Sequence, residues 1–375
     1  GRGGRGMDAL IAPALTWVDG ALRPGLALRI RGGRIESVAP LAGATPDLRV
    51  HLATPGPTDL QVNGGGGVLF NADPSAAGIA AIRAAHHRLG THAILPTVIT
   101  DAPEVLDAAA DAVIAARGQP GIEGIHIEGP HIAPERRGTH DPSHIRPLDA
   151  RTLAVLERLR AAEVPVLLTL APELADPALL ARARALGVVL SAGHSSASAE
   201  QAGAAFGRGI TMATHLFNAM PPLHHRAPGL AAAAILSDAW LGMIADGLHV
   251  DWPMLRLAIA ARPQPGRCFL VSDAMPTVGG PDQFTLYGKR IRLENGRLVN
   301  DQGALAGAHL DMMTALARLH LLGGVALKDC IAMATDAPRA AMGLAPLRIA
   351  PGTPAAAVAV LDAGLGFAGW LDAPG

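Results

Sequence analysis

The sequence is poor in aromatic residues. Only 3% of its 375 residues are Phe, Trp or Tyr, although 50% are hydrophobic. A core built on large rings is excluded, so many short elements must supply Ala, Val, Leu and Ile side chains. This composition favours a layered α/β protein. At this length we expect one α/β barrel, which remains a single domain at roughly 250 residues, with a small companion.

An excess of charge of either sign is also missing. The 31 basic and 32 acidic residues nearly cancel, which argues against a nucleic-acid or anionic membrane surface as the partner. No uninterrupted apolar run approaches the roughly 18 residues that span a bilayer. We therefore expect a soluble protein that binds a small molecule.

Cysteine and lysine are scarce. Cys268 and Cys330 lie far apart without metal-type or redox spacing, which favours two free thiols in a reducing cytoplasm. Only Lys289 and Lys328 are lysines, and neither ends one of the barrel strands predicted below. A Schiff-base aldolase mechanism therefore lacks its nucleophile, and a carbamylated lysine bridging two metals is equally disfavoured.

The residue pattern divides the chain into segments of different kinds. Residues 1–6 (GRGGRG) precede Met7, lack an apolar h-region and are interpreted as an expression-tag remnant. Two β-like runs, 27–30 and 34–40, flank the turn signal Gly32-Gly33 and predict a small sheet. From Thr54 onward, strand-like runs alternate with Ala-rich segments of helical length, which is βα repetition.

Eight such runs are strand candidates, and eight strands fit a closed (β/α)8 TIM-like barrel. They are 58–62, 92–99, 124–128, 165–170, 188–193, 211–216, 241–245 and 268–272. A hairpin over 286–298 is predicted from the Asn295-Gly296 turn, with helices starting at Gly307 and Lys328. Short strands in 347–361 should rejoin the N-terminal sheet. We expect a small β-sandwich domain (7–53 with 345–375) and a catalytic barrel (54–344).

Three residues at predicted strand ends could hold a metal. Glu128 ends the third strand, and His194 and His215 end two consecutive strands. Two imidazoles and a carboxylate leave a fourth position open for water, as a catalytic zinc site requires. Any one of these histidines alone would more often be a structural, hydrogen-bonded group. Their joint position at one rim of the barrel favours the metal site.

Asp273 ends the eighth predicted strand on the same rim. There its carboxylate could take a proton from activated water and pass it to a leaving amine. The alternative is a helix N-cap, a position that Asp also favours.

The motifs of this chain resemble those of a known family, N-acetylglucosamine-6-phosphate deacetylase, within the amidohydrolase superfamily. The resemblance rests on motifs that occur in that family's order over about two-thirds of the chain: PGPTDLQVNGGGG from Pro55, HIEGPHI from His126, GTHDP from Gly138, SAGHS from Ser191, THLFNAMPPLHHRAPG from Thr214, DGLHV from Asp246, VSDAM from Val271 and LAGAHLDM from Leu305. It implies hydrolysis of N-acetylglucosamine 6-phosphate to glucosamine 6-phosphate and acetate.

The resemblance also implies roles for individual residues. Glu128, His194 and His215 are similar to the family's metal ligands, Asp273 to its general base and acid, and His140 to the donor that polarises the acetyl carbonyl. Without the motif, His140 would be taken as an exposed loop histidine. Sugar or phosphate contacts are implied for Asn218, Ala219, Arg226, His249 and Ala308, although Ala308 could equally serve packing and Arg226 could be a solvated loop charge. A homodimer is implied, with Arg226 donated to the neighbouring active site.

One departure concerns the number of metals. Many superfamily members carry His-x-His on the first strand, where this chain has Gln61 and Asn63. Amides are poor ligands for a borderline-soft cation, so these are vestigial second-metal positions and one divalent metal is expected. Zn²⁺ is the first choice, and Fe²⁺, Co²⁺ or Mn²⁺ fit the same donors.

Alternatives stay open at this stage. The motifs define the acetyl and phosphate ends of the substrate better than the C4 hydroxyl, so another N-acetyl hexosamine 6-phosphate, such as the galactosamine epimer, is a close alternative. A catalytically inactive amidohydrolase-like scaffold is a second. A cyclic-amide hydrolase such as a dihydroorotase is disfavoured, because both His-x-His and the bridging lysine are missing.

Overall fold

The computed structural model describes residues 6–375. The expected tag remnant, residues 1–6, lies outside the described residues except for Gly6.

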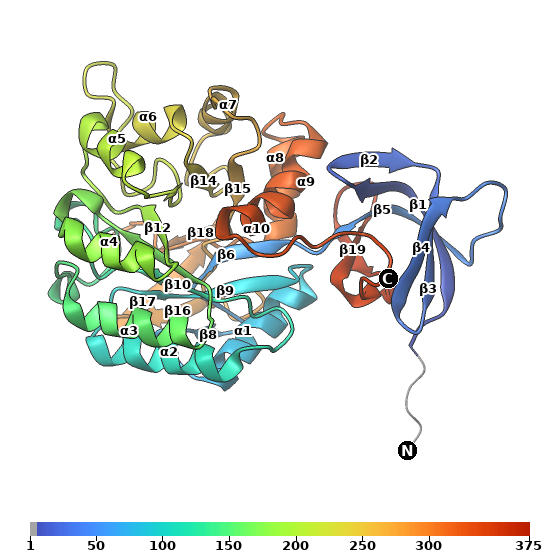
Figure 1. Cartoon of the computed structure of the whole chain (residues 1–375), viewed down its shortest axis with the longest axis horizontal. Coiled ribbons are helices and arrows are strands. Elements are labelled where there is room, and N and C mark those ends of the chain that lie inside the picture. The colour runs from blue at the N-terminus through green and yellow to red at the C-terminus, as the bar shows by residue number, and fades with distance from the viewer. Residues whose placement is uncertain (1–5) are drawn as a thin grey trace.

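Eight parallel strands form a barrel, which confirms the predicted fold class (Figure 1). In spatial order they are β6 (Thr58–Val62), β9 (Ala93–Ile99), β10 (Ile125–Glu128), β11 (Val166–Leu170), β12 (Val189–Ala192), β13 (Met212–Ala213), β14 (Trp240–Met243) and β15 (Cys268–Leu270). A parallel bridge between Val62 and Ala274, just beyond β15, completes the ring. The buried interior is largely aliphatic, as the scarcity of aromatic residues predicts.

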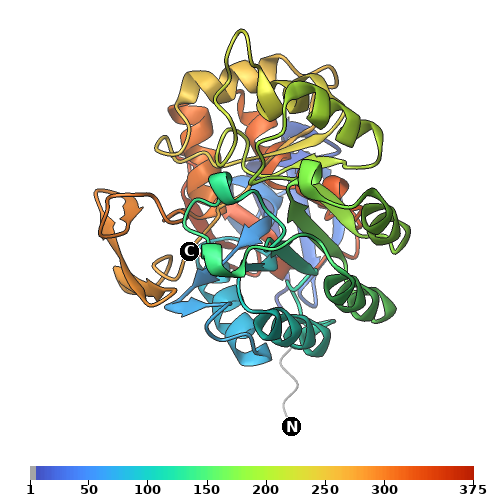
Figure 2. The same cartoon turned by 90° about the vertical axis from the view of Figure 1, so that its left-hand side faces the viewer.

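Helices surround the strands (Figure 2). They are α1 (Ala76–Arg88), α2 (Pro103–Ala116), α3 (Ala150–Ala161), α4 (Pro177–Ala185), α5 (Ala199–Gly207), α6 (Gly229–Leu236), α7 (Trp252–Ala260), α8 (Met312–Leu321), α9 (Leu327–Ala334) and α10 (Asp336–Met342), with short 3-10 turns at Pro134–Arg136, Pro142–His144, Pro172–Leu174 and Ala355–Ala357. Ser198 and Gln201 form a capping box at the start of α5, which satisfies backbone donors there. None of the helices described here has the length and apolarity to cross a bilayer.

The predicted strands occur at their expected places but are mostly shorter. The clearest case is 211–216, of which only Met212–Ala213 is a strand. The backbone leaves the sheet because His215 and Phe217 have positive φ angles of 29° and 75°. The helix expected from Gly307 begins at Met312 instead, since Gly307 has φ 73° and Asp311 provides the N-cap.

Both chain ends build one separate eight-stranded sheet. It contains β1 (Ala9–Val18), β2 (Ala21–Pro24), β3 (Leu26–Arg31), β4 (Arg34–Pro40), β5 (Leu48–Pro55), β19 (Val358–Leu361), β20 (Phe367–Trp370) and β21 (Ala373–Pro374). Strand β5 pairs in parallel with β1 and antiparallel with β19, so it joins the two ends. Within 347–361 the sheet strand is Val358–Leu361; before it, Pro354 makes an isolated antiparallel bridge to Arg34 and Ala355–Ala357 forms a 3-10 turn. The sheet has its own small apolar core.

A small third sheet stands beside the barrel, coloured orange in Figure 2. It contains β16 (Gln283–Leu286), β17 (Lys289–Glu294) and β18 (Arg297–Val299). The predicted hairpin corresponds to β17–β18 with its Asn295-Gly296 turn, whereas the pairing of β16 through a second turn at Tyr287-Gly288 was not predicted. A two-stranded pair, β7 (Gly64–Gly65) and β8 (Val68–Leu69), follows β6.

Candidate active site

Three side chains converge at the C-terminal rim of the barrel. Glu128 is the last residue of β10, and His194 and His215 each follow their strand by two residues. All three are buried, and one potential ligand atom from each lies within 4.8 Å of the others. Glu128 Oε2 is 3.3 Å from His194 Nε2 and 3.1 Å from His215 Nε2. The carboxyl ends of parallel strands share one edge, which is why residues far apart in sequence meet here.

The donor set fits a divalent cation. His194 Nδ1 lies 2.7 Å from the Arg136 carbonyl oxygen, which can only accept, so Nδ1 carries the proton. Burial lowers the pKa of His194 to about 4, so the ring is neutral near pH 7 and Nε2 presents a lone pair. That lone pair faces the Glu128 carboxylate and lies 3.3 Å from His215 Nε2. Clustered donor atoms of this kind repel one another unless a cation lies between them, and carbonyl-oriented histidine is typical of metal sites.

The electrostatics of Glu128 agree with a ligand role. Burial alone would raise its pKa, but the neighbouring imidazoles of His140, His194 and His215 hold the pKa well below the usual range. The carboxylate is therefore ionised in the folded protein and able to bind a cation.

Three of the site residues have left-handed backbone conformations. The φ angles are 46° at His194, 29° at His215 and 50° at Asp273. Residues other than glycine seldom adopt this region, and strain of this kind is concentrated at functional sites. Here it turns the chain sharply at the end of each strand, where the side chain is directed over the barrel.

Asp273 lies beside the cluster and has amide partners of its own. Its backbone N–H donates to the Gln61 carbonyl oxygen at 2.9 Å, and its Oδ1 accepts from Asn63 Nδ2 at 2.7 Å. Burial and then the charge of Glu128 raise its pKa to about 6. A carboxyl group with such a pKa can both accept and return a proton near neutrality. The N-cap alternative is not seen, because the next helix of the described chain, α8, begins at Met312.

Gln61 and Asn63 contact the site through amide donors. Gln61 Nε2 donates to Glu128 Oε2 at 2.9 Å, just as Asn63 donates to Asp273. In these orientations both amides present N–H groups to site carboxylates instead of oxygen ligands to a second metal.

His140 comes from a loop but is buried against the cluster. Its Nε2 lies 3.6 Å from Glu128 Oε1, and its ring centroid is 4.4 Å from that of His194. Its other nitrogen, Nδ1, is 2.6 Å from Thr100 Oγ1. The alternative that His140 is an exposed loop histidine is therefore wrong, because the side chain is buried.

The remaining candidates lie around this centre at different distances. Asn218 and Ala219 directly follow the His215 turn, and the backbone N–H of Ala308 donates to the Asp273 carbonyl oxygen at 3.0 Å. His249 Nδ1 bonds Asp246 Oδ2 at 2.6 Å. Arg226, by contrast, is exposed on the loop between β13 and α6, which projects beyond the neighbouring helices (Figures 1 and 2).

Two residues next to the site, Asp59 and Thr100, were not predicted from the sequence. Asp59 Oδ1 accepts from the backbone N–H groups of Gln61 and Ser272, both at 3.2 Å, and so ties β6 to the end of β15. Burial raises its pKa to about 7. Thr100 follows β9 directly, so the rule that selected Glu128 and Asp273, a polar residue at a strand end, would also have found it.

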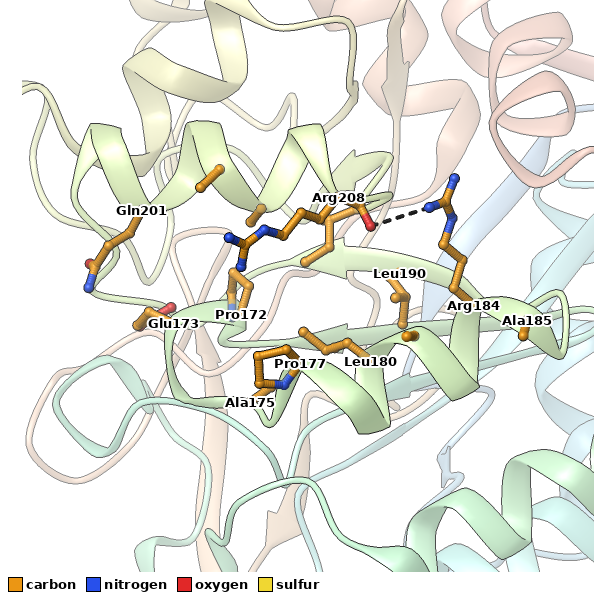
Figure 3. Close-up of a pocket in the computed structure, with 14 residues that line it drawn as sticks. Pro172, Glu173, Ala175, Pro177, Leu180, Arg184, Ala185, Leu190, Gln201 and Arg208 are labelled. Atoms are coloured by element: carbon orange, nitrogen blue, oxygen red, sulfur yellow. Dashed lines mark hydrogen bonds between the residues drawn. The ribbon is translucent and has the colours of Figure 1, made fainter.

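A cavity of about 700 Å³ lies between α4 and α5, and none of the candidate residues lines it (Figure 3). Glu173, at its wall, accepts from Ser195 Oγ at 2.6 Å and from Ser196 N at 2.9 Å. It thereby holds the segment that follows His194.

An α/β barrel with a carboxylate, two histidines and an aspartate at its C-terminal rim defines a class of metal-dependent hydrolases. Residues 52–365 match the model of the amidohydrolase family, and the chain belongs to this family. The family implies a divalent metal, for which the cluster of Glu128, His194 and His215 is suited.

Similar proteins within the family carry more particular names. An N-acetylgalactosamine-6-phosphate deacetylase of Shewanella sp. (strain ANA-3) is 39% identical over 284 residues, 75% of this chain and 71% of that protein. An N-acetylglucosamine-6-phosphate deacetylase of Haemophilus influenzae is 32% identical over 329 residues, 85% of each chain. The crystal structure of N-acetylglucosamine-6-phosphate deacetylase from Pasteurella multocida superposes with a TM-score of 0.89 at 27% identity, covering 96% of this chain and 97% of that one. The resemblance drawn from the motifs is thereby confirmed.

Proposed function

We propose that this chain hydrolyses the acetamide of N-acetylglucosamine 6-phosphate, which gives glucosamine 6-phosphate and acetate. The observation that carries the proposal is the convergence of Glu128, His194 and His215 with Asp273 at one rim of the barrel. When bound, the metal would lower the pKa of water and polarise the acetyl carbonyl. Asp273 accepts the proton of the attacking water and returns it to the leaving nitrogen.

His140 supports the same reaction. Its Nε2 lies 3.6 Å from Glu128 Oε1, beside the proposed metal ligands, and an N–H on it donates to the acetyl oxygen as negative charge develops there. Asn218, Ala219 and Ala308 contact the sugar, while His249 and Arg226 bind the phosphate. Arg226 suits this task because its planar guanidinium donates two parallel hydrogen bonds to phosphate oxygens.

The epimer at C4 is the second candidate substrate. The Shewanella relative is named for the galactosamine compound, whereas the Haemophilus and Pasteurella proteins are named for the glucosamine compound. Steady-state acetate release from both N-acetyl hexosamine 6-phosphates distinguishes them, and we expect the higher kcat/KM with the gluco epimer. A protein that binds no metal and releases acetate from neither epimer would be an inactive scaffold, and the proposal would be wrong.

We propose one metal per subunit, with Zn²⁺ preferred over Fe²⁺, Co²⁺ or Mn²⁺. The orientation of Gln61 and Asn63 as N–H donors supports one site instead of two. We expect His194→Ala or His215→Ala to lose the metal, because each removes one of three protein ligands, and Gln61→Ala to lose little. Elemental analysis after dialysis measures this directly. Unchanged content in the histidine variants, or an empty site in Gln61→Ala, would contradict it.

Assembly and location complete the proposal. A homodimer in which Arg226 serves the neighbouring active site is supported by the exposure of Arg226 on a projecting loop. A cytoplasmic location is supported by two buried, unpaired cysteines, Cys268 and Cys330. We also propose the domain division 7–53 with 345–375, and 54–344, since the chain ends share one sheet and the barrel another.

A further inference from the structure

The hydroxyl of Thr100 is in contact with the inner nitrogen of His140. Thr100 is fully buried at the end of β9, and its Oγ1 lies 2.6 Å from His140 Nδ1. Among residues 6–375, no other partner within hydrogen-bonding distance of this hydroxyl is found. The proton position on His140 therefore depends on which of the two atoms donates.

The two tautomers of a neutral ring differ at both ends. With the proton on Nε2, Thr100 donates its hydroxyl to the Nδ1 lone pair, and the Nε2–H points toward Glu128 Oε1 at 3.6 Å. With the proton on Nδ1, the Thr100 hydroxyl proton has no acceptor, and an Nε2 lone pair faces a carboxylate oxygen. A buried donor without a partner is expensive, and two facing lone pairs repel. Both ends thus favour the proton on Nε2.

The third sheet holds Thr100 in place. The hydroxyl of Tyr287, the only tyrosine of the sequence, donates to the backbone carbonyl of Thr100. Tyr287 lies in the turn between β16 and β17 with φ 51°, followed by Gly288 with φ 74°. This turn thus reaches from outside the barrel to the residue behind His140.

We infer that Thr100 is a positioning residue: it fixes His140 in the tautomer whose Nε2–H can polarise the acetyl carbonyl, and the Tyr287 turn supports it. The catalytic part of this inference rests on the proposed function, whereas the tautomer does not.

Kinetics test the catalytic part. Thr100→Val keeps the side-chain shape without the hydroxyl. We expect kcat to fall roughly 10- to 100-fold with KM little changed, which is less than the roughly 100- to 1,000-fold loss of an oxyanion donor because His140 itself remains. Thr100→Ser restores the donor and should remain within about threefold of the parent. The loss of kcat in Thr100→Val should be smaller on an N-trifluoroacetyl substrate, whose carbonyl is already activated.

Thr152→Val is the matched control. It removes another buried threonine hydroxyl that contacts a histidine, His131, which lies outside the proposed machinery. It should leave kcat unchanged.

Nitrogen-15 NMR of the zinc-loaded protein tests the tautomer without turnover. The His140 signals are identified by their absence in His140→Gln, and we expect Nε2 protonated in the parent and in Thr100→Ser, but a mixture in Thr100→Val. An Nδ1-protonated ring in the parent, or an unchanged tautomer and kcat in Thr100→Val, would overturn the inference. So would an equal loss on both acyl groups. If the parent released no acetate at all, the proposed function would fail, while the NMR result would still decide the tautomer.

Discussion

At the scale of single residues, Asp273 is a buried carboxyl group whose pKa lies close to neutrality. Its pKa is raised to about 6 by burial and by Glu128, against the lowering effects of His215 and of the Asn63 hydrogen bond. We expect Asp273→Asn to keep metal and substrate but to lose about 100- to 10,000-fold in kcat, because the amide cannot accept a proton. Steady-state kinetics with metal analysis of the same preparation measures this. A variant with near-native kcat would exclude Asp273 as the base.

Asp59 makes a different prediction, about stability and pH. Burial raises its pKa from 3.8 to about 7, and its Oδ2 has no hydrogen-bond partner in the described structure. The folded state therefore holds the proton more tightly than the unfolded chain does. The stability from this group is fully present below about pH 4 and is lost as the pH rises through about 7, by at most about 4 kcal/mol.

Asp59→Asn cannot ionise, so it should lose this pH dependence. We expect its thermal midpoint, relative to that of the parent, to rise between pH 5 and about pH 7 and to level off by pH 8.5. Scanning calorimetry at one fixed scan rate across that range measures the difference. Parallel curves for the two proteins would show that Asp59 does not titrate there.

At the scale of elements, the third sheet is attached to the barrel through a small apolar core. Leu286, Ile291 and Leu298 pack with Leu69 and Met275. The Tyr287 turn also connects this sheet to the backbone of Thr100.

We expect Ile291→Ala to destabilise this sheet by about 2–5 kcal/mol, because it leaves a cavity in that core. Hydrogen exchange should become faster in residues 283–299 and remain unchanged in the barrel strands. Thr285→Ala, at an exposed position on the same sheet, is the control and should exchange like the parent. Equal acceleration in the barrel would mean that the sheet does not open separately.

The elements also show where sequence patterns stop being informative. The eight barrel strands are predicted because buried parallel strands are continuous apolar runs. The ends of these strands are not predicted. The apolar run in 211–216 continues through Leu216, whereas β13 ends at Ala213 and His215 already has a positive φ. The backbone conformation at His215 depends on contacts with neighbouring strands. Similarly, the dipeptide Asn295-Gly296 predicts a hairpin turn, whereas Tyr287-Gly288 is only a weak turn signal.

At the scale of the whole molecule, the proposed dimer makes a quantitative prediction. Arg226 would act on the phosphate bound in the neighbouring subunit, so Asp273→Asn and Arg226→Ala subunits can complement each other. With random pairing, about half of the dimers are mixed and half of their sites are intact, so roughly a quarter of native activity should return under two-fold symmetry. Co-expression of the two variants, followed by an acetate-release assay, measures this.

The competing geometry gives a distinct result. If Arg226 served its own subunit, no mixed site would hold both groups, and activity would not exceed that of the separate variants. Arg226→Ala alone should raise KM for the phosphorylated sugar far more than for its unphosphorylated analogue, because it contributes binding remote from the acetyl group.

The sequence by itself determined the barrel, the joining of the two chain ends in one sheet, and the set Glu128, His194, His215 and Asp273 as candidates. These follow from local signals: apolar runs record burial, and polar residues at strand ends mark the rim of a barrel. Only the tertiary structure decided how the candidates relate to one another. Thr100 beside His140, Gln61 donating to Glu128, and Asp59 joining β6 to β15 are contacts between segments 40 to 213 residues apart. No local pattern encodes them, because closure of the barrel creates them.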